Sequence, residues 1–355
     1  MSVTIMPHDL YWVLGEQKLG PLEFYFAEAL KKNGKNVNYI NIHSLYPEKW
    51  KTFSRYSHRL PRKYDSSIQN KYSAVINNAL LEKYKIEKPS YVFIYNDCRI
   101  LPETIETFKR SGTKVIIFLG DDPNYLYTGK KTFLLTVMFA DVVIVPDSGW
   151  IDGLKMLDIN NFIYSPVGTD TDVFFPLTPN EAQFAKYSSD VMFIGTGYYL
   201  NSWGIKRAAV LNELCGLNMK IFGDRLWYEM FPYFPDLSKH FINESLSSSE
   251  VNVACSSAKL YPVIVNAGVI NGVPTRVFDC IASGIFVLAE YKKDIDELFP
   301  EGEVVSFRSK KELREKADYY LRNENEMKEH ISKARKTVSE KYTLTLLVKN
   351  ILEQI

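Results

Sequence analysis

The sequence has few cysteines, almost no net charge and no long apolar run, and each of these absences excludes a class of protein. Its 43 lysines and arginines balance 42 acidic residues, so the chain has no global field that would attract a polyanion. No apolar run approaches the roughly 20 residues that span a bilayer. The cysteines share no C-x-x-C spacing, which predicts reduced core thiols instead of disulfides or a metal site; they are Cys98, Cys215, Cys255 and Cys280.

Targeting and metal signals are missing as well. The amino-terminal stretch MSVTIMPHDLYWVLG has no basic region and no small-residue cleavage site, so we expect no signal peptide and a cytoplasmic protein. The histidines show no ligand spacing, so we expect no metal site. What the chain does have is 355 residues, 46% of them apolar and 24% charged. These values are typical of a globular protein with two domains.

Short apolar runs alternate with longer amphipathic ones, which is the pattern of βα units and parallel sheets. The segment 162–177 breaks the alternation with two prolines, a glycine and no helical period, so it resembles a linker. We therefore predict an α/β chain of two facing Rossmann-like domains, 1–175 and 176–355, with a cleft between them and with carboxyl-terminal helices able to pack back on the first domain. Ligands of such folds bind outside the carboxyl ends of the strands. Strands are predicted at 37–42, 91–96, 114–120, 141–146, 190–197, 219–223, 261–268, 285–290 and 303–307.

A glycine loop follows the predicted strand at 190–197. Gly195, Thr196 and Gly197 would let backbone amides approach a phosphate at the positive end of the next helix. Lys206 and Arg207 in that helix favour the same interpretation, although a tight turn that needs positive φ would use the same glycines. Gly223 ends the next strand, in the segment FGDRLW, which we expect near a nucleobase.

The stretch GVPTRVFDCIASG predicts a short helix between Pro274 and Gly284. Arg276 and Asp279 lie three positions apart and so share a face. Arg276 at the amino end could hold a phosphate where the helix dipole also favours one, and Asp279 could accept both hydroxyls of a ribose. Asn271, in the preceding loop, could bind sugar hydroxyls. The competing interpretation is an exposed ion pair worth a few tenths of a kcal/mol.

The first half offers candidates for the acceptor side of a reaction. Asp121 and Asp122 directly follow a predicted strand, where one carboxylate could act as general base toward a hydroxyl. An aspartate before a proline is also an ordinary turn former, and the residues alone do not decide between the pair. Gly15 and Gly20 form another glycine loop that runs into a helix, with a plain turn as the equal alternative.

One segment departs from the neutral average. Residues 43–63 carry six lysines and arginines against one acidic residue, interleaved with aromatic side chains. Basic groups neutralise phosphates and aromatic faces stack on bases or sugars, so Trp50, Arg55 and Arg59 are candidates for binding an anionic acceptor. A solvated loop with partly buried aromatic residues is the commoner explanation of such a segment.

The motif in TRVFDCIASG and its sequel resemble the donor-binding end of GT-B glycosyltransferases, in particular the family-4-like group related to spore-maturation proteins. The sequel includes Leu298-Phe299, Gly302 and Glu312-Leu313, and the segments FLGDDP and YSPVGTDTDVFFP are similar to the same families' amino domain and hinge. The donor motif and the aspartate after IIFLG also resemble phage DNA glucosyltransferases.

This resemblance implies roles for individual residues. Arg276 would contact the diphosphate, Asp279 would bind the ribose, and Asp121, with Asp122 as fallback, would be the base of an inverting reaction. Two departures stand out, because these families usually have glutamate at position 279, and retaining members often have an acid where this chain has Asn271.

We therefore expect a glycosyltransferase that moves a hexose or pentose from a UDP- or GDP-sugar to a hydroxyl acceptor. The chemical step would need no cofactor and no metal; a divalent metal could assist product release, but no site for one is identified. The acceptor would be a saccharide or glycolipid precursor, or hydroxymethylated phage-type DNA. The alternative is a non-catalytic two-domain protein that binds a small molecule. The sequence leaves the nucleobase, the sugar, the stereochemical outcome and the oligomeric state open.

Overall fold

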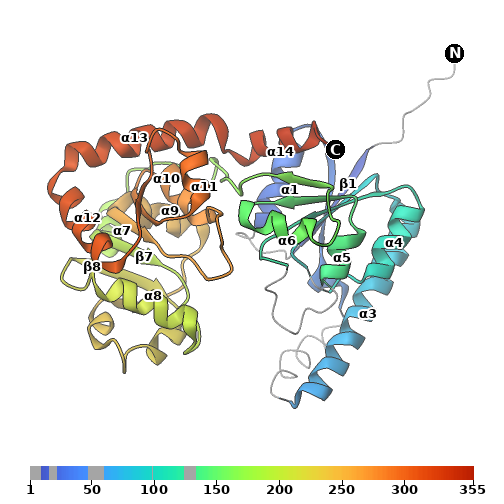
Figure 1. Ribbon diagram of the computed structural model, residues 1–355, viewed down its shortest axis with the longest axis horizontal. Helices are drawn as coiled ribbons and strands as arrows, with labels where there is room; N and C mark the ends of the chain where they lie inside the picture. Colours follow the sequence, from blue (N-terminus) through green and yellow to red (C-terminus); the bar gives the residue numbers. More distant parts are fainter. Residues whose placement is uncertain (1–8, 16–21, 47–59, 98, 124–132) are drawn as a thin grey trace. The chain divides into compact units, whose positions relative to one another are not determined.

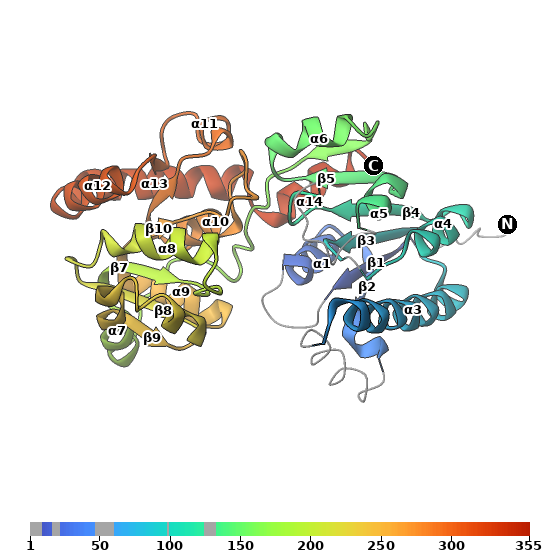
Figure 2. The same ribbon diagram turned by 60° about the horizontal axis from the view of Figure 1, so that its bottom comes forward.

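The computed structural model describes residues 9–15, 22–46, 60–97, 99–123 and 133–355, and its chain forms two compact units. The first unit contains the residues up to Ser165 together with Val348–Ile355, and the second is Pro166–Leu347. Each unit is built on a six-stranded sheet with helices on both faces (Figures 1 and 2). Within the described ranges, no helix has both the length and the apolar character needed to cross a bilayer.

The sheet of the first unit is entirely parallel, in the order β2-β1-β3-β4-β5-β6. Its strands are β1 (Leu10–Gly15), β2 (Asn36–Asn41), β3 (Tyr91–Tyr95), β4 (Lys114–Phe118), β5 (Val142–Val145) and β6 (Phe162–Tyr164). Its helices are α1 (Leu22–Lys32), α3 (Arg62–Glu87), α4 (Pro102–Arg110), α5 (Phe133–Phe139) and α6 (Ile151–Lys155), with 3-10 turns η1 (Ile42–Leu45) and η2 (Ser148–Trp150).

Side chains that alternate along these strands form two apolar layers, one on each face of the first sheet. Trp12 and Leu14 of β1 pack with apolar residues of α3, α4, α5 and α6 in one cluster. On the opposite face, Phe26 of α1 packs on Phe93 and Phe118, with ring centroids 5.2 and 6.0 Å away. Because both faces are covered, the strands are apolar along most of their length.

The sheet of the second unit is also entirely parallel, in the order β12-β11-β10-β7-β8-β9. Its strands are β7 (Ser189–Ile194), β8 (Met219–Gly223), β9 (Phe241–Asn243), β10 (Ala258–Val263), β11 (Phe286–Glu290) and β12 (Val305–Phe307). Its helices are α7 (Glu181–Tyr187), α8 (Ser202–Asn212), α9 (Ser248–Ser257), α10 (Thr275–Ser283), α11 (Lys293–Leu298), α12 (Lys310–Arg322), α13 (Glu324–Lys341) and the start of α14 (Leu344–Leu352), with 3-10 turns η3 (Arg225–Glu229) and η4 (Pro235–Lys239).

The units divide at Ser165, not at residue 175 as the sequence suggested. Residues 166–175 belong to the second unit because Thr169 pairs there with the backbone before α14. The Thr169 amide donates to the Tyr342 carbonyl at 3.1 Å, and the Thr169 carbonyl accepts from the Leu344 amide at 2.8 Å. The first residues of the predicted linker also form strand β6, which pairs with β5.

Both strand orders contain a point where neighbouring strands lead their helices to opposite faces. In the first sheet this switch point lies between β1 and β3, and in the second between β10 and β7. The carboxyl ends of the strands at a switch point leave a crevice where doubly wound folds bind their ligands. The fold therefore directs attention to two loci, one in each unit.

Candidate functional site

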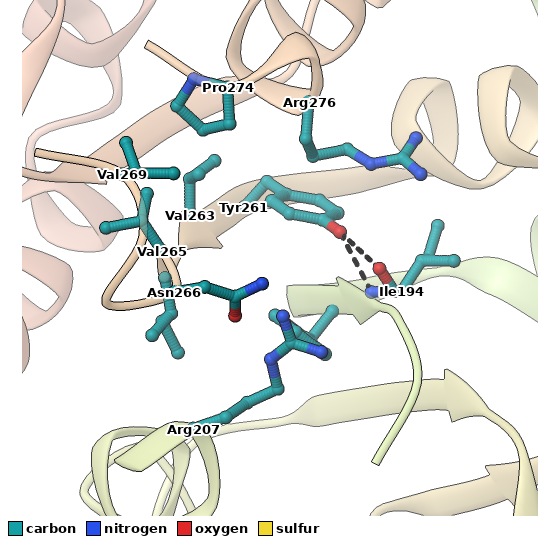
Figure 3. Close-up of a pocket in the computed structure, with 11 residues that line it drawn as sticks. Ile194, Arg207, Tyr261, Val263, Val265, Asn266, Val269, Pro274 and Arg276 are labelled. Atoms are coloured by element: carbon teal, nitrogen blue, oxygen red, sulfur yellow. Dashed lines mark hydrogen bonds between the residues drawn. The ribbon is translucent and has the colours of Figure 1, made fainter. Parts of the chain in front are cut away.

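The second unit has a pocket of about 200 Å³ at its switch point (Figure 3). Its floor is apolar and comes from the ends of β7 and β10 and the loop after β10. Arg207 from α8, Arg276 from α10 and Asn266 add polar groups. The volume is below the roughly 300–1,000 Å³ of a complete small-ligand site, so it has room for only part of such a ligand. The remaining lining residues are Phe193, Ile194, Tyr261, Val263, Ile264, Val265, Val269 and Pro274.

Tyr261 joins the two strands beneath the pocket. Its hydroxyl donates to the Ile194 carbonyl at 2.8 Å and accepts from the Ile194 amide at 3.0 Å, as Figure 3 shows. The side chain is buried, and burial raises the pKa of Tyr261 well above its ordinary value. Tyr261 is therefore a neutral structural anchor that fixes the spacing of β7 and β10.

Arg276 reaches the pocket because α10 is anchored by its other side. The helix runs from Thr275 to Ser283, with Pro274 just before it and Gly284 in the left-handed conformation (φ 85°) just after it. Phe278 is fully buried and packs against the rings of Phe299 and Tyr342. This packing leaves the Arg276 side chain 32% exposed beside Tyr261, with its guanidinium extending past the ring (Figure 3). The predicted helix and its end residues are confirmed.

Arg207 approaches the same pocket from α8. Its Nη1 donates to the Thr196 carbonyl at 2.6 Å, and its guanidinium lies 4.5 Å from the centroid of the Tyr198 ring. Asn266 Nδ2 donates to the Tyr198 hydroxyl at 2.8 Å. Tyr198 thus orders both polar partners, and it does so from a backbone with φ 58°, which is rare for a bulky side chain. We had not predicted this residue, although an aromatic residue directly after the glycine loop was a visible signal.

Asp279 does not share the pocket with Arg276. The described residues that line it include neither Asp279 nor Asn271. Asp279 is 7% exposed, and its Oδ1 accepts a hydrogen bond from the Thr169 hydroxyl at 2.8 Å. Its Oδ2 lies 3.9 Å from Arg276 Nη1. Burial raises the pKa of Asp279 to about 6, although Arg276 and Thr169 both favour the ionised form. The geometry gives Asp279 a structural contact, and the expected ribose contact stays a prediction.

The glycine loop packs against protein atoms, and both of its glycine amides donate to protein acceptors. The Gly195 amide donates to the Phe222 carbonyl at 3.0 Å, and the Gly197 amide donates to Asp224 Oδ1 at 3.2 Å. Thr196 Oγ1 donates to Asp224 Oδ2 at 2.5 Å. Both donors are therefore used by protein acceptors, and the expected phosphate contacts of Gly195 and Gly197 stay predictions. Neither glycine has a positive φ, so the turn interpretation is wrong.

Close packing explains Gly197 and Gly223 instead. A Cβ on Gly197 would lie 2.4 Å from the Trp227 amide nitrogen, and a Cβ on Gly223 would lie 2.4 Å from the Gly195 carbonyl oxygen. Trp227 is fully buried and donates from Nε1 to that same carbonyl. It is a core residue, not a contact for a nucleobase. Lys206 is also occupied, with bonds to the Val265 carbonyl and to Glu290.

The described part of the locus in the first unit is acidic and lies at the ends of β1, β3 and β4. Asp121 is exposed, and its Oδ2 accepts a bond from Asn96 Nδ2 at 2.7 Å. Glu23 from α1 is buried beneath the end of β1, where a Cβ on Gly15 would lie 2.2 Å from its Cγ. Burial, Glu23 and Asp121 together raise the pKa of Tyr95 well above its ordinary value. The sequence did not single out Glu23, although it stands in the first turn of a helix after a glycine loop.

Other predicted residues lie outside the described part of the chain, or do not line the pocket of the second unit. Gly20, Trp50, Arg55, Arg59 and Cys98 lie outside the described residues. Asp122 is partly exposed beside Asp121, and Asn271 accepts a bond at its carbonyl from the Asp294 amide. Cys255 and Cys280 are buried thiols with their Sγ atoms 3.8 Å apart, and Cys215 is half-buried.

Comparison with known proteins agrees with this architecture. Residues 206–353 match the model of a family described as glycosyl transferase-like. A search of curated protein sequences found no match. The finer grouping with spore-maturation or phage enzymes stays a prediction.

Solved structures resemble the chain along nearly its whole length. The sucrose-phosphate synthase of Thermosynechococcus elongatus is 10% identical, with a TM-score of 0.69 over 97% of this chain and 98% of that one. The E. coli trehalose-6-phosphate protein bound with UDP-2-fluoro glucose is 11% identical, with a TM-score of 0.67 over 97% and 98%. Anabaena HepE in complex with UDP and glucose is 11% identical, with a TM-score of 0.60 over 98% and 99%. The α/β prediction is thus confirmed: the chain has the GT-B fold, and residues 206–353 are similar to a glycosyl transferase-like family.

Proposed function

We propose that this protein is a glycosyltransferase that uses a nucleotide-sugar donor held by the second unit. The observation that carries the proposal is the pair of guanidinium groups, Arg207 and Arg276, that line one pocket at the β7–β10 switch point. Arginine suits phosphate because its fork of donors binds oxygen atoms in pairs. A diphosphate on the apolar floor would meet a positive group from α8 and another from the start of α10.

The same two groups suit the chemical step. When the sugar leaves the donor, negative charge builds on the departing diphosphate, and fixed positive groups stabilise that charge. In this proposal Arg207 and Arg276 supply the stabilisation, so the step itself needs no metal ion. Two of the similar structures hold UDP or a UDP-sugar, which makes a UDP-hexose the first donor to test.

We propose an uncharged hydroxyl, as on a saccharide or glycolipid precursor, as the acceptor. The described locus of the first unit carries the carboxylates of Glu23 and Asp121, which would repel the phosphates of a nucleic acid. Asp121 would take the hydroxyl proton while the acceptor oxygen bonds to the sugar carbon and the bond to the diphosphate breaks. This direct displacement would invert the configuration at that carbon.

Salt dependence separates a saccharide acceptor from DNA. Binding of duplex DNA that engages several phosphates should weaken steeply between about 50 and 200 mM salt. Such binding, measured by fluorescence anisotropy, would favour DNA over the saccharide. No binding at 50 mM salt supports the saccharide.

A ligand panel tests the donor site. Selective binding raises the melting temperature, so UDP, GDP, ADP and their sugars should separate in a thermal-shift assay. Arg276→Ala should then weaken binding of the selected nucleotide about 10- to 150-fold, because a hydrogen bond to a charged group is worth roughly 1.5–3 kcal/mol. Arg322→Ala removes an exposed arginine on α12 and is the matched control.

The outcomes divide the alternatives. Unchanged affinity in Arg276→Ala would overturn the donor assignment. Nucleotide binding without any release of nucleoside diphosphate from its sugar, even slowly into water, would favour the non-catalytic binding protein.

A further inference from the structure

The residue that directly follows β3 has an unusual backbone. Asn96 has φ 43°, in the left-handed region that costs most residues free energy. Among the described residues, three others that are not glycine share this conformation. Lys88 and Asp158 end helical turns, where it is common, and Tyr198 lies at the pocket of the second unit. Asn96 directly follows a strand at the switch point of the first unit.

Only one of the two polar atoms of the Asn96 side chain has a hydrogen-bond partner among the described residues. Its Nδ2 donates to Asp121 Oδ2 at 2.7 Å, while its Oδ1 is buried and has no hydrogen-bond partner among the described residues. An unpaired buried acceptor costs roughly 1–3 kcal/mol. Glycine at this position would avoid that cost and would adopt the backbone conformation without strain. The presence of asparagine despite this cost indicates a use for the side chain itself.

The surrounding chain is shaped around this amide. The Asn96 backbone amide donates to the Phe118 carbonyl at 3.0 Å, which ties it to the end of β4. A Cβ on Gly120 would lie 2.7 Å from the Tyr95 hydroxyl and 3.2 Å from the Asn96 Cβ. The absence of a side chain at Gly120 therefore lets Asn96 lie against the turn that carries Asp121.

We infer that Asn96 is a positioning residue that holds Asp121, and not Asp122, as the base toward the acceptor. This inference rests on the proposed function. The Nδ2 bond fixes the carboxylate through Oδ2 and leaves Oδ1 to take the hydroxyl proton. Among the described residues, the other titratable groups near this locus include Glu23 from α1, Tyr39 from β2, Tyr95 from β3, Asp122, and Asp97, which pairs with Arg99.

A double-mutant cycle tests the inference. Asn96→Gly removes the amide and tolerates the backbone, and Lys88→Gly is the control that changes a left-handed residue at the end of α3. With the donor selected by the panel, or UDP-glucose and water as acceptor, Asn96→Gly should lower kcat about 10- to 100-fold. The donor KM should stay the same. In the Asp121→Asn background, Asn96→Gly should have no further effect on kcat, because it acts through Asp121.

A pH profile supplies a readout that a structural role would not move. Asn96→Asp places a second negative charge beside Asp121, so the acid limb of the kcat profile should shift to higher pH. Wild-type kcat in Asn96→Gly, or effects of Asn96→Gly and Asp121→Asn that multiply, would overturn the inference and leave the proposed function standing. A wild-type protein that binds no nucleotide-sugar would overturn the proposed function, and this inference with it.

Discussion

The buried charge of Asp279 should make the stability of this protein depend on pH in a definite direction. The pKa of Asp279 is about 6, against an ordinary value of 3.8, and burial is the largest cause. The folded protein therefore binds this proton more tightly than the unfolded chain. The stabilisation from this group is complete below pH 3.8 and is lost as the pH rises through 6. Between pH 5 and pH 7.5 the loss amounts to about 1.4 kcal/mol of unfolding free energy.

Asp279→Asn isolates this contribution. The amide oxygen can still accept from Thr169, but no charge is buried at any pH. Relative to the wild type, the variant should therefore gain about 1.4 kcal/mol between pH 5 and pH 7.5, measured by urea unfolding at both values. Asp152→Asn, which removes an exposed carboxylate on α6, should follow the wild type. Parallel pH dependences for Asp279→Asn and the wild type would refute the reasoning.

Two further substitutions test the packing behind the donor pocket. Gly197→Ala should lower the free energy of unfolding, measured with urea, by about 1–3 kcal/mol, because the new Cβ would lie 2.4 Å from the Trp227 amide nitrogen. Gly195→Ala, whose nearest contact is a side-chain atom at 3.2 Å, should cost less, and equal losses would contradict this packing. Thr169→Val should lower the free energy of unfolding at pH 7.5 by about 1–3 kcal/mol, because it removes a donor from a buried carboxylate. Thr169→Ser should keep the bond, and a valine variant as stable as the wild type would show that the bond contributes little.

The arrangement of the two sheets could be predicted because the strands are continuous apolar runs between helices. β3, β4, β5, β8, β11 and β12 all lie within the predicted ranges, and β7 begins one residue before its predicted range. The strands that were not predicted are β1, β6 and β9. β1 lies in a stretch that we examined only for a targeting signal, and β6 lies in the predicted linker. β9 has three residues, too few for any period to appear.

Helix α9 illustrates a local signal that we overlooked. Its residues, SSEVNVACSS, are small and partly polar, so the apolar stripe is weak. Its start is nevertheless encoded, because Ser247 and Glu250 form a capping box in which each side chain accepts from the other's backbone amide. A serine followed three positions later by glutamate is a helix-start pattern that a sequence can show.

The candidate site was less predictable because residue type alone does not say where a donor or acceptor is already used. Gly195 and Gly197 have the composition of a phosphate loop, yet Phe222 and Asp224 accept their amide hydrogens. Arg276 and Arg207 were predicted, and the structure places both at one pocket. What joins them is the strand order, which brings β7 beside β10 although α8, β8, β9 and α9 separate them along the chain.

The contact between Asp279 and Thr169 gives the short carboxylate at position 279 a physical reason. The chain passes between its two units after Ser165 and after Leu347. Thr169 lies just past the first passage, and its backbone pairs with Tyr342 and Leu344 just before the second. Asp279 bonds the Thr169 side chain from α10, one turn after Arg276. The helix that carries Arg276 is thereby fastened to both connecting segments at a single buried residue. A change at Thr169 should consequently disturb the arginine pocket and the connection between the units together, although Thr169 touches neither a ligand nor the pocket.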